Sequence, residues 1–523
     1  MKTKASLAST PCSKPLSTRL RTACATWLLP LLLLTPPAAL QAQFAFTTNN
    51  GAITITRYYG PLGTNVTIPS SINGWPVTTI AGKNFQNSGL TSVTIPKSVT
   101  NIAGGAFAYT ATLTAITVAT NNPAYSSLNG VLFNRNQTSL VQYPGGKLGA
   151  YAIPNNVSSI GSEAFAGCTN LTGVTIGNNV TSIGFRAFDI CTSLTSATVP
   201  NSVTTMGGGA FTFCTSLTNI VLGNSVTIIG DEAFYGCTSL TSISIPDSVV
   251  SIEGWGAFAN CTNLTNVIIG NGLTNIGDAL HAYPAFPGCS SLTAITVNTD
   301  NPAYSSLNGV LFNRSQTTLV EYPAGKVGAY SIPNSVADII YAAFFECTAL
   351  TSVTAGNNLS SIKAAAFAGC VSLTNITVGS GLISLETGAF DGCYNLTGVY
   401  FQGNAPPPDL YGPFIIGYYI NATVYYLPGT AGWGTNYGGR PTAPWFLPHP
   451  LILAGSSFGV QTNGFGFVIS WATNIPVLVE ACTDLANPLW FPVGTNILTH
   501  GSSYFSDPQW SNYPARFYRL RSP

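Results

Sequence analysis

Cysteine is the reactive residue type with the most regular spacing in this chain of 523 residues. Nine cysteines stand three positions after a phenylalanine of a repeated segment: Cys168, Cys191, Cys214, Cys237, Cys261, Cys289, Cys347, Cys370 and Cys393. In a secreted chain such a set would normally suggest disulfides. Identical positions along a ladder have nearly parallel Cβ vectors, however, which is poor geometry for bridging. The spacing therefore predicts buried free thiols, and the isolated Cys482 is given no role.

Other residues that could catalyse a reaction are few and scattered. A hydrolase needs an activated nucleophile or two positioned carboxylates. The only histidines are His281, His449 and His500, and none recurs with a partner in a catalytic motif. No C-x-x-C, H-E-x-x-H or phosphate-binding glycine loop occurs, and Asp484 and Asp507 lack the ligand spacing of a calcium loop. We expect no enzyme activity, no metal and no cofactor.

The cysteines belong to a unit that the chain repeats many times, as in Ile160 to Val180, IGSEAFAGCTNLTGVTIGNNV. Successive phenylalanines are 58, 23, 23, 23, 24, 28, 58, 23 and 23 residues apart. They are Phe107, Phe165, Phe188, Phe211, Phe234, Phe258, Phe286, Phe344, Phe367 and Phe390. A unit this short cannot bury its own apolar face and must stack on its neighbours. We therefore expect a repeat solenoid with these phenylalanines filling its interior.

Within one unit, Leu171, Val174 and Ile176 are spaced to point inward from a short strand. Val180 and Ile183 follow a Gly/Asn turn and predict a second short strand. The segment from Gly184 to Cys191 has the spacing of one helical turn, which only packing could hold. The predicted fold is mainly β, with a parallel sheet and short helical turns.

The copy LTSISIPDSVVSIEGWGAFANC, Leu240 to Cys261, shows the unit most fully, with one extra residue near Trp255. It resembles the leucine-rich repeat of BspA-like bacterial surface proteins, whose signature is roughly L-x-x-I-x-I-P-x-x-V-x-x-I-G-x-x-A-F-x-x-C. The likeness covers about residues 68–401. It implies a secreted or cell-surface protein that binds other macromolecules and performs no known chemistry. It does not transfer a ligand.

Residues 1–42 are typical of a cleaved secretory signal peptide. Five basic residues and no acidic one precede the apolar run ATWLLPLLLL, which is too short for a membrane span and is interrupted by Pro30. A mature chain from Gln43 has 13 basic and 17 acidic residues, a formal charge of 13 − 17 = −4. That sign argues against nucleic acid or an anionic membrane as partner. We expect a secreted or cell-surface, extracellular protein with no transmembrane segment.

The solenoid is assigned to residues 43–400, with an N-terminal cap and two inserts. From Phe44 to Ile80 the runs FAFTT, AITITRYY and NVTIP alternate like strands, with an Asn-Gly turn between the first two. The segment NPAYSSLNGVLFNR occurs at 122–135 and again at 301–314, within inserts at about 119–153 and 298–332. Each insert is predicted to contain a hairpin. The hairpins either protrude as contact elements or fill the coil edge, and their apolar composition favours filling.

The last part of the chain is divided into two regions. Residues 401–450 are rich in Pro, Gly, Tyr and Trp and are expected to form a C-terminal cap, around Trp433, and a linker. Exposure of these aromatics as a binding patch is the alternative. Residues 451–523 predict a small antiparallel β-sandwich, which loosely resembles fibronectin-type-III-like tail modules. We expect Trp471, Trp490 and Trp510 in its core, and Arg516, Arg519 and Arg521 on a solvated strand.

The outward strand positions are the candidate binding face, and none of them is charged. They are Thr94, Thr117, Thr175, Thr198, Val221, Ser244, Ile268, Thr296, Thr354, Thr377 and Tyr400. Such a face offers no electrostatic steering and few large anchors, but weak contacts repeated along a rod add up. The favoured interpretation is a non-enzymatic adhesion protein that binds a protein or glycan surface. The alternative is a self-associating structural surface or matrix component, with ice binding a remote variant.

Overall fold

Each copy of the repeat forms one coil made of two short strands and a turn. The computed structural model describes residues 43–254, 256–277, 284–407, 412–414, 420–462 and 464–522. Residues 1–42, predicted to be a signal peptide, and His281 lie outside the described residues. One coil contains β14 (Leu171–Thr175), β15 (Ser182–Ile183) and the Ala-Phe turn, residues 184–191. That turn is a series of hydrogen-bonded turns and not the predicted helical turn, with Ala187 N donating to Gly184 O at 3.3 Å.

The first strands of successive coils pair in parallel and form the first sheet. It runs in sections: β3 (Asn65–Thr67), β6 (Ser92–Ile95) and β8 (Ala115–Val118); β12 (Gly149–Ala152), β14, β16 (Ser196–Thr198) and β18 (Asn219–Val221); β20 (Ser242–Ile245), β22 (Asn266–Ile269) and β24 (Ala294–Val297); β28 (Gly328–Ser331), β30 (Leu350–Thr354), β32 (Asn375–Val378) and β34 (Gly398–Phe401). Beyond the predicted limit at 400 the last section continues through β35 (Thr423–Tyr426) and β37 (Arg440–Pro444), with β36 (Asn436–Tyr437) antiparallel to β37.

The second strands of the coils form a second parallel sheet of two-residue strands. Its members are β7 (Asn101–Ile102), beside β5 of the cap; β13 (Ser159–Ile160), β15, β17 (Thr205–Met206), β19 (Ile228–Ile229), β21 (Ser251–Ile252) and β23 (Asn275–Ile276); and β29 (Asp338–Ile339), β31 (Ser361–Ile362) and β33 (Ser384–Leu385). The cap over the first coil consists of β1 (Phe44–Asn49), β2 (Ala52–Tyr58), β4 (Ser71–Ile72) and β5 (Trp75–Ile80), and its predicted β1–β2 hairpin is confirmed.

The recurring phenylalanines fill the interior, as predicted. All ten are at most 2% exposed, and from Phe165 to Phe286 successive ring centroids lie 4.7 to 5.5 Å apart in stacked geometry. The column extends one ring past the predicted repeats, because Phe414 stacks on Phe390 at 5.4 Å. The solenoid therefore has a continuous aromatic column within each section of the rod.

Each insert forms one further coil of the solenoid in addition to its hairpin. The inserts contain β9 (Tyr125–Leu128), β10 (Val131–Asn134) and β11 (Ser139–Gln142), and likewise β25 (Tyr304–Leu307), β26 (Val310–Asn313) and β27 (Thr318–Glu321). β11 pairs in parallel with β13, so it takes the place of a second-sheet strand. Tyr143 then takes the place of the phenylalanine and stacks on Phe165 at 5.0 Å, and Tyr322 stacks on Phe344 at 4.9 Å. The search for Ala-Phe pairs missed these coils because the ring is a tyrosine.

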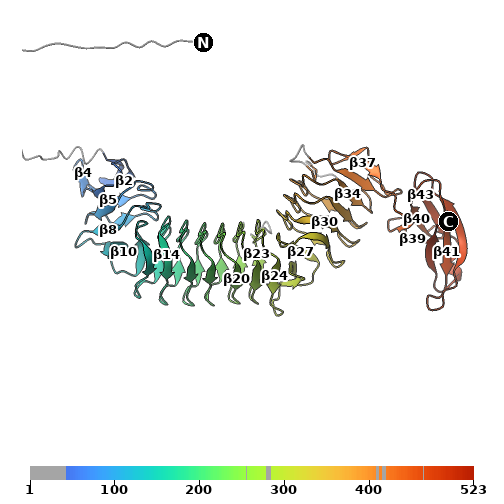
Figure 1. The fold of residues 1–523 in the computed structure, drawn as a ribbon, viewed down its shortest axis with the longest axis horizontal. Coiled ribbons are helices and arrows are strands. Elements are labelled where there is room, and N and C mark those ends of the chain that lie inside the picture. The colour runs from blue at the N-terminus through green and yellow to red at the C-terminus, as the bar shows by residue number, and fades with distance from the viewer. Residues whose placement is uncertain are drawn as a thin grey trace, which may run out of the picture.

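The middle strand of each insert separates two parts of the core. Leu132 packs with the N-terminal cluster, whereas its neighbours Val131 and Phe133 pack with the central one. In the second insert, Leu311 packs with the central cluster, whereas its neighbours Val310 and Phe312 pack with the C-terminal one. The hairpins thus fill the rod, and Figure 1 shows the rod turning in the same sense near β10 and near β27, so that the whole molecule is an arc.

The C-terminal region is a small two-sheet antiparallel sandwich, as predicted. One sheet holds β38 (Leu451–Leu453), β39 (Gly459–Gln461), β40 (Gly464–Ser470) and β43 (Ser502–Asp507); the other holds β41 (Pro476–Cys482), β42 (Phe491–Ile497) and β44 (Phe517–Arg521), and the 3-10 helix η1 (Trp510–Asn512) precedes β44. Phe467, Ile469, Val477, Val479, Leu498 and Phe505 form its core. All three tryptophans expected there are half-buried; Trp471 packs against this core, as expected, whereas Trp490 and Trp510 are not among its side chains.

The three arginines of this sandwich form ion pairs; the side chains of Arg519 and Arg521 are also solvent-exposed, as expected, at 47% and 67%, whereas that of Arg516 is 10% exposed. Arg519 and Arg521 lie 2.7 and 3.5 Å from Glu480, and Arg516 lies 3.1 Å from Asp507. Both carboxylates are about 5% exposed at the side chain, so the basic cluster neutralises two buried acids. Within the described ranges, no helix has the length and apolarity that crossing a membrane requires.

Candidate functional site

The predicted binding residues form rows on the outside of the first sheet, which we call the strand face. Thr94, Thr377 and Tyr400 are half-buried and the other eight are exposed. Pairing sets them in register, for example Thr175 beside Thr198 beside Val221, and Thr354 beside Thr377 beside Tyr400. Their outward orientation is confirmed, and their role in binding stays a prediction.

The strand face ends in an aromatic group. Tyr400 stacks on Tyr425 of the next strand at 4.7 Å, and the Trp445 ring lies 5.0 Å from Tyr400. Trp433 instead packs on Phe401 at 5.0 Å and on Tyr426 at 5.5 Å, over the end of the core. Among the described residues of 401–450, these aromatic side chains therefore form a cap, around Trp433, and a half-exposed platform at the end of the strand face, formed by Tyr425 and Trp445 together with Tyr400.

The cysteines are structural, as expected. All ten in the described residues are free and buried. Seven of the repeat thiols donate to the carbonyl oxygen of the phenylalanine in the preceding coil at 3.1 to 3.2 Å. Burial raises the pKa of the Cys214 thiol well above the ordinary value of a cysteine. A thiol in this environment stays protonated and unreactive.

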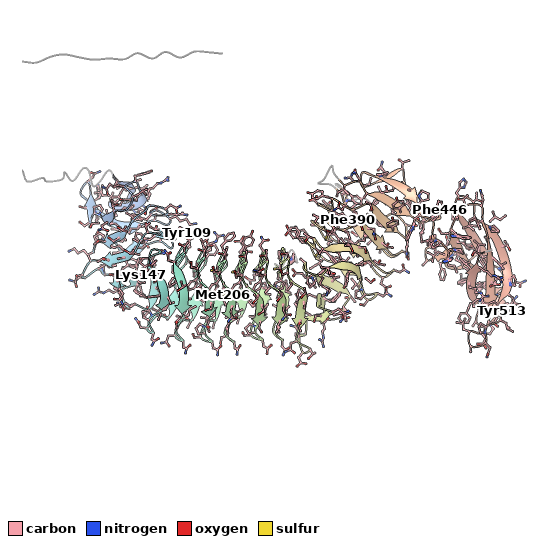
Figure 2. All side chains as sticks on the ribbon, viewed as in Figure 1. Tyr109, Lys147, Met206, Phe390, Phe446 and Tyr513 are labelled. Atoms are coloured by element: carbon pink, nitrogen blue, oxygen red, sulfur yellow. The ribbon has the colours of Figure 1, made fainter. Side chains whose placement is uncertain are left out.

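Sequence reasoning missed a charged cluster at the Ala-Phe turns beside the first insert. Tyr109 Oη donates a hydrogen bond of 2.5 Å to Asp189 Oδ2. Arg186 lies 4.0 Å from Asp189 and 3.2 Å from Glu232. Figure 2 shows Tyr109 on the inner side of the first bend. We call this group the corner cluster, and it consists of Lys83, Tyr109, Glu163, Arg186, Asp189 and Glu232.

Asp189 is the most buried charged group of the cluster. It is 3% exposed, and burial raises the pKa of its carboxyl group against the opposing effects of the Tyr109 hydrogen bond and of Arg186. Burial and Asp189 together raise the pKa of the Tyr109 phenol, so its proton stays in place as the donor. Beside the cluster lies a cavity of about 660 Å³, whose wall includes Phe213 and Tyr235 with their rings 5.2 Å apart.

Several side chains of this site stand on a strained backbone. Most Ala-Phe turns have left-handed residues two positions before and two positions after the phenylalanine, and many copies place glycine there, such as Gly209 and Gly236. At the corner, seven of these positions hold other residues with φ between 50° and 61°, as Asn260, Ala342, Glu346 and Ala365 do in other coils: Lys83, Tyr109, Glu163, Arg186, Ile190, Phe213 and Glu232. A left-handed non-glycine residue costs about 1–2 kcal/mol. Outliers of this kind cluster at functional sites.

The second bend provides an internal comparison. The duplicated inserts are offset by 179 residues, and at that offset Tyr109, Glu163, Arg186 and Asp189 correspond to Gly288, Ala342, Ala365 and Ala368. Ala342 and Ala365 have the same left-handed backbone, with φ of 54°. The coil therefore folds without the cluster. Aligning the copies by these two columns is the sequence signal that would have revealed it.

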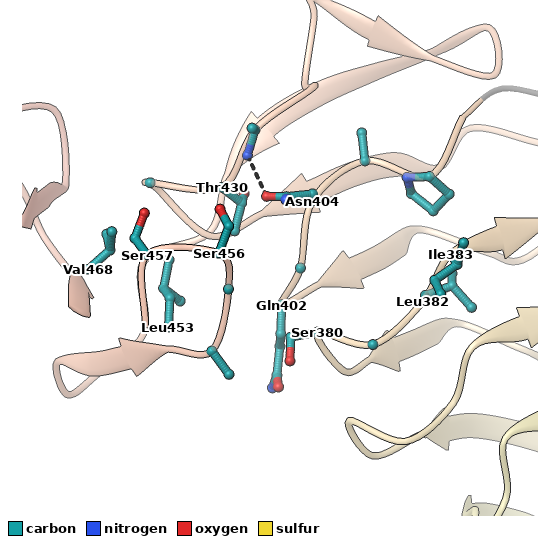
Figure 3. A pocket seen from close by; sticks show the side chains of 18 of the residues that line it. Ser380, Leu382, Ile383, Gln402, Asn404, Thr430, Leu453, Ser456, Ser457 and Val468 are labelled. Carbon is teal, nitrogen blue, oxygen red and sulfur yellow. Dashed lines mark hydrogen bonds between the residues drawn. The ribbon is translucent and has the colours of Figure 1, made fainter. Parts of the chain in front are cut away.

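A second cavity, of about 460 Å³, lies between the last coils and the sandwich. Figure 3 shows Ser456, Ser457 and Leu453 facing Ser380 and Gln402 across it, with Asn404 Oδ1 accepting a hydrogen bond of 2.8 Å from Ala431 N. Ser457 is the serine of a Gly-x-Ser-x-Gly match, residues 455–459, but a nucleophile elbow joins a strand to a helix. Here the match joins β38 to β39, and the lining is uncharged.

Metal chemistry finds no support in the described part of the chain. No group of three His, Cys, Asp or Glu side chains lies close enough there to hold a metal ion. Asp507, weighed above as a calcium ligand, accepts hydrogen bonds from Tyr518 Oη at 2.9 Å and from Gln509 N at 3.0 Å.

A family model describes most of these coils. The BspA type leucine rich repeat region matches residues 53–144, 141–255, 210–331 and 322–406. The chain belongs to this family. The BspA-type match ends at 406, whereas the parallel sheet of this protein continues to Pro444. The sandwich from Leu451 onward also lies outside the BspA-type region.

Solved leucine-rich repeat structures are similar to this BspA-type protein. A leucine rich cell surface protein from Faecalibacterium prausnitzii A2-165 is 28% identical, with a TM-score of 0.41 over 73% of this chain and 93% of that one. A leucine-rich repeat protein from Eubacterium ventriosum ATCC 27560 is 22% identical, with a TM-score of 0.40 over 57% and 82%. The pneumococcal vaccine antigen PcpA is 16% identical, with a TM-score of 0.32 over 74% and 92%. No curated protein matches the chain.

Proposed function

We propose that this BspA-type protein is a secreted or cell-surface, non-enzymatic adhesion protein that contacts a large protein or glycan surface through its strand face. The observation that supports this most directly is the row of exposed, uncharged strand residues in register along the rod. Small polar contacts repeated at the coil spacing gain strength by multivalency, although each is weak. The signal-like segment at 1–42 supports export.

Contact energy on this face is expected to concentrate at its aromatic end. Tyr400, Tyr425 and Trp445 are half-buried and in mutual contact, and rigid Tyr and Trp side chains are the usual hot spots of interfaces. The rest of the face carries no charge and gives little electrostatic steering. Binding should therefore depend on avidity and only weakly on salt.

The sandwich at 451–523 is proposed to be a fibronectin-type-III-like module that holds or spaces the rod. Seven short antiparallel strands in two sheets support that resemblance. It lies next to the C-terminal end of the rod in Figure 1, beyond β37.

Binding of the chain from Gln43 onward to arrays of extracellular proteins and glycans tests the proposal. Saturable binding that Tyr425→Ala weakens about tenfold, and that Tyr394→Ala leaves unchanged, is expected. Tyr394 is the control because it is 55% exposed but follows Cys393 in an Ala-Phe turn, away from the strand face. Absence of saturable binding across the arrays would count against adhesion.

Self-association as a structural component is the second candidate. Val221 and Ile268 are 50% and 45% exposed on the strand face, and charged residues are only 7% of the sequence. Low net charge and exposed apolar side chains favour association of copies. Sedimentation over a concentration series distinguishes the two candidates, because a strictly monomeric chain contradicts the second.

A further inference from the structure

We propose that the cavity at the corner cluster is a binding site for a short segment of neutral carbohydrate. It lies on the Ala-Phe turns at the inner side of the first bend, apart from the strand face (Figure 2). It therefore adds a specific site to the proposed avidity surface. Unpartnered polar atoms, balanced charges and exposed aromatic rings come together in this cavity.

Three buried polar atoms of the cluster lack a hydrogen-bond partner: Glu163 Oε2, whose side chain does not line the cavity, and two atoms that a ligand in the cavity would reach. Among the described residues, Asp189 Oδ1 and Arg186 Nε are buried without a hydrogen bond, and both side chains line the cavity. A buried charged group left unpaired costs roughly 1–3 kcal/mol or more. The carboxylate needs a donor and the guanidinium needs an acceptor. A hydroxyl group satisfies either of them.

The charges around the cavity exclude a strongly charged ligand. Lys83 and Arg186 are positive, whereas Asp189 and Glu232 are negative, and all four line the same cavity. Glu163, 3.6 Å from Lys83, adds a third acid. An anion would meet these acids and a cation would meet the two bases, in a partly desolvated site where such repulsion is strong. A neutral ligand with several hydroxyls meets neither penalty.

The rest of the cavity suits a sugar ring. Phe213 is 43% exposed and contacts Tyr235 edge to face, so the wall presents apolar ring surface beside the polar groups. Flat apolar surface with a few convergent polar atoms is how pockets orient a small ligand. The apolar C–H face of a pyranose matches the rings while its hydroxyls reach Asp189 and Arg186. About 660 Å³ is within the range of small-molecule sites.

The second bend argues against a purely structural role for the cluster. Gly288, Ala342, Ala365 and Ala368 replace the charged set in the same duplicated frame. The first bend thus keeps a buried carboxylate and a guanidinium, each with one atom that lacks a hydrogen bond, where the second bend has alanine. A ligand supplies the missing partners and accounts for that cost.

Titration calorimetry with the chain from Gln43 onward tests the site. The probes are neutral gluco-, xylo-, manno- and galacto-oligosaccharides of two to four units, with sialyllactose and a chitosan tetramer as charged comparisons. Asp189→Ala and Arg186→Ala introduce the residue found at the matching position of the second bend, so both variants are expected to fold. Asp391→Ala is the matched control, because Asp391 directly follows Phe390 just as Asp189 follows Phe188.

Saturable binding of a neutral oligosaccharide is expected, at least tenfold weaker in Asp189→Ala and in Arg186→Ala and unchanged in Asp391→Ala. The tenfold figure corresponds to one hydrogen bond to a charged group. The proposal is overturned if no neutral probe binds, if only charged probes bind, or if both corner variants bind as the unaltered chain does. Tyr425→Ala tells the two proposals apart, because loss of oligosaccharide binding in that variant places the ligand on the strand face.

Discussion

Glu321 is a carboxyl group where the matching position of the first insert has an amide, Gln142. It is 4% exposed and accepts hydrogen bonds from the backbone N–H groups of Ala285 and Phe286, at 3.0 and 2.9 Å. Burial nevertheless raises its pKa to about 8. Gln142 donates to Ala164 O at 3.1 Å and carries no charge. The two copies of one insert therefore differ in how they respond to pH.

Glu321→Gln is expected to flatten the pH dependence of unfolding. The folded pKa is raised, so the folded chain holds a proton that the unfolded chain has released. Stability from this group is fully present below about pH 4.5 and is lost as pH rises to about 8. Urea unfolding at pH 5, 7 and 9 measures the effect, with the exposed Glu253→Gln as control. An unchanged slope in Glu321→Gln contradicts the raised pKa.

At the scale of the element, one coil is held by its neighbours and very little by itself. Thr195 Oγ1 donates to Thr172 O and Thr218 Oγ1 donates to Thr195 O, both at 3.1 Å and both one coil back. Inside the rod, the cysteine thiols likewise donate hydrogen bonds to a backbone carbonyl oxygen of the preceding coil. Removing the ring that each coil contributes to the aromatic column should therefore destabilise the whole section.

Phe211→Ala and Phe213→Ala test this on one turn. Phe211 is fully buried between Phe188 and Phe234, at 5.0 and 5.5 Å, whereas Phe213 is 43% exposed. Phe211→Ala should lower the free energy of unfolding by about 3–5 kcal/mol. Phe213→Ala should change it by about 0.5 kcal/mol or less. Equal losses in thermal unfolding would mean that the buried column does not carry the stability.

The coil was predictable from sequence because one residue type dominates its interior. Phenylalanine at a near-constant spacing and the inward triplet of Leu171, Val174 and Ile176 are enough to define it. The coils of Tyr143 and Tyr322 were not found, since a tyrosine there buries the same ring area without the Ala-Phe signature. The corner cluster escaped as well, because its members are 149 residues apart in sequence, from Lys83 to Glu232, and meet only when the coils stack.

At the scale of the whole molecule, the two inserts set the shape of the rod. Each is 35 residues long, and each follows a first-sheet strand, β8 or β24. The hairpin strands of each insert widen the stack on the side of the sheets, opposite the Ala-Phe turns. On the Ala-Phe side the coil of Tyr109 contacts that of Phe165 directly, with Tyr109 N donating to Ala166 O at 2.9 Å. A wedge on one side bends the stack toward the other.

Deleting residues 119–153 should straighten the first bend. The deletion joins Val118 to Pro154 and restores a phenylalanine spacing of 58 − 35 = 23 residues. We expect the radius of gyration in solution scattering to stay equal or to grow although 35 residues are gone. Deletion of 298–332 should do the same at the second bend. A radius that falls in proportion to the lost mass, with unchanged curvature, contradicts the wedge.

The two closed ends of the rod limit how copies can polymerise. At one end β2 continues the parallel ladder on β5 and β1 reverses direction on β2, while Tyr58 lies over Phe85 at 5.6 Å. At the other end Trp433 lies over Phe401, and β36 reverses direction on β37. Among the described residues, β3 of the first sheet and β33 of the second remain parallel edge strands, so the caps cover the aromatic column but not every strand. Stacking of copies end to end through their cores is thereby disfavoured, and we expect a sheet-like array of this protein to form mainly by lateral contact between rods.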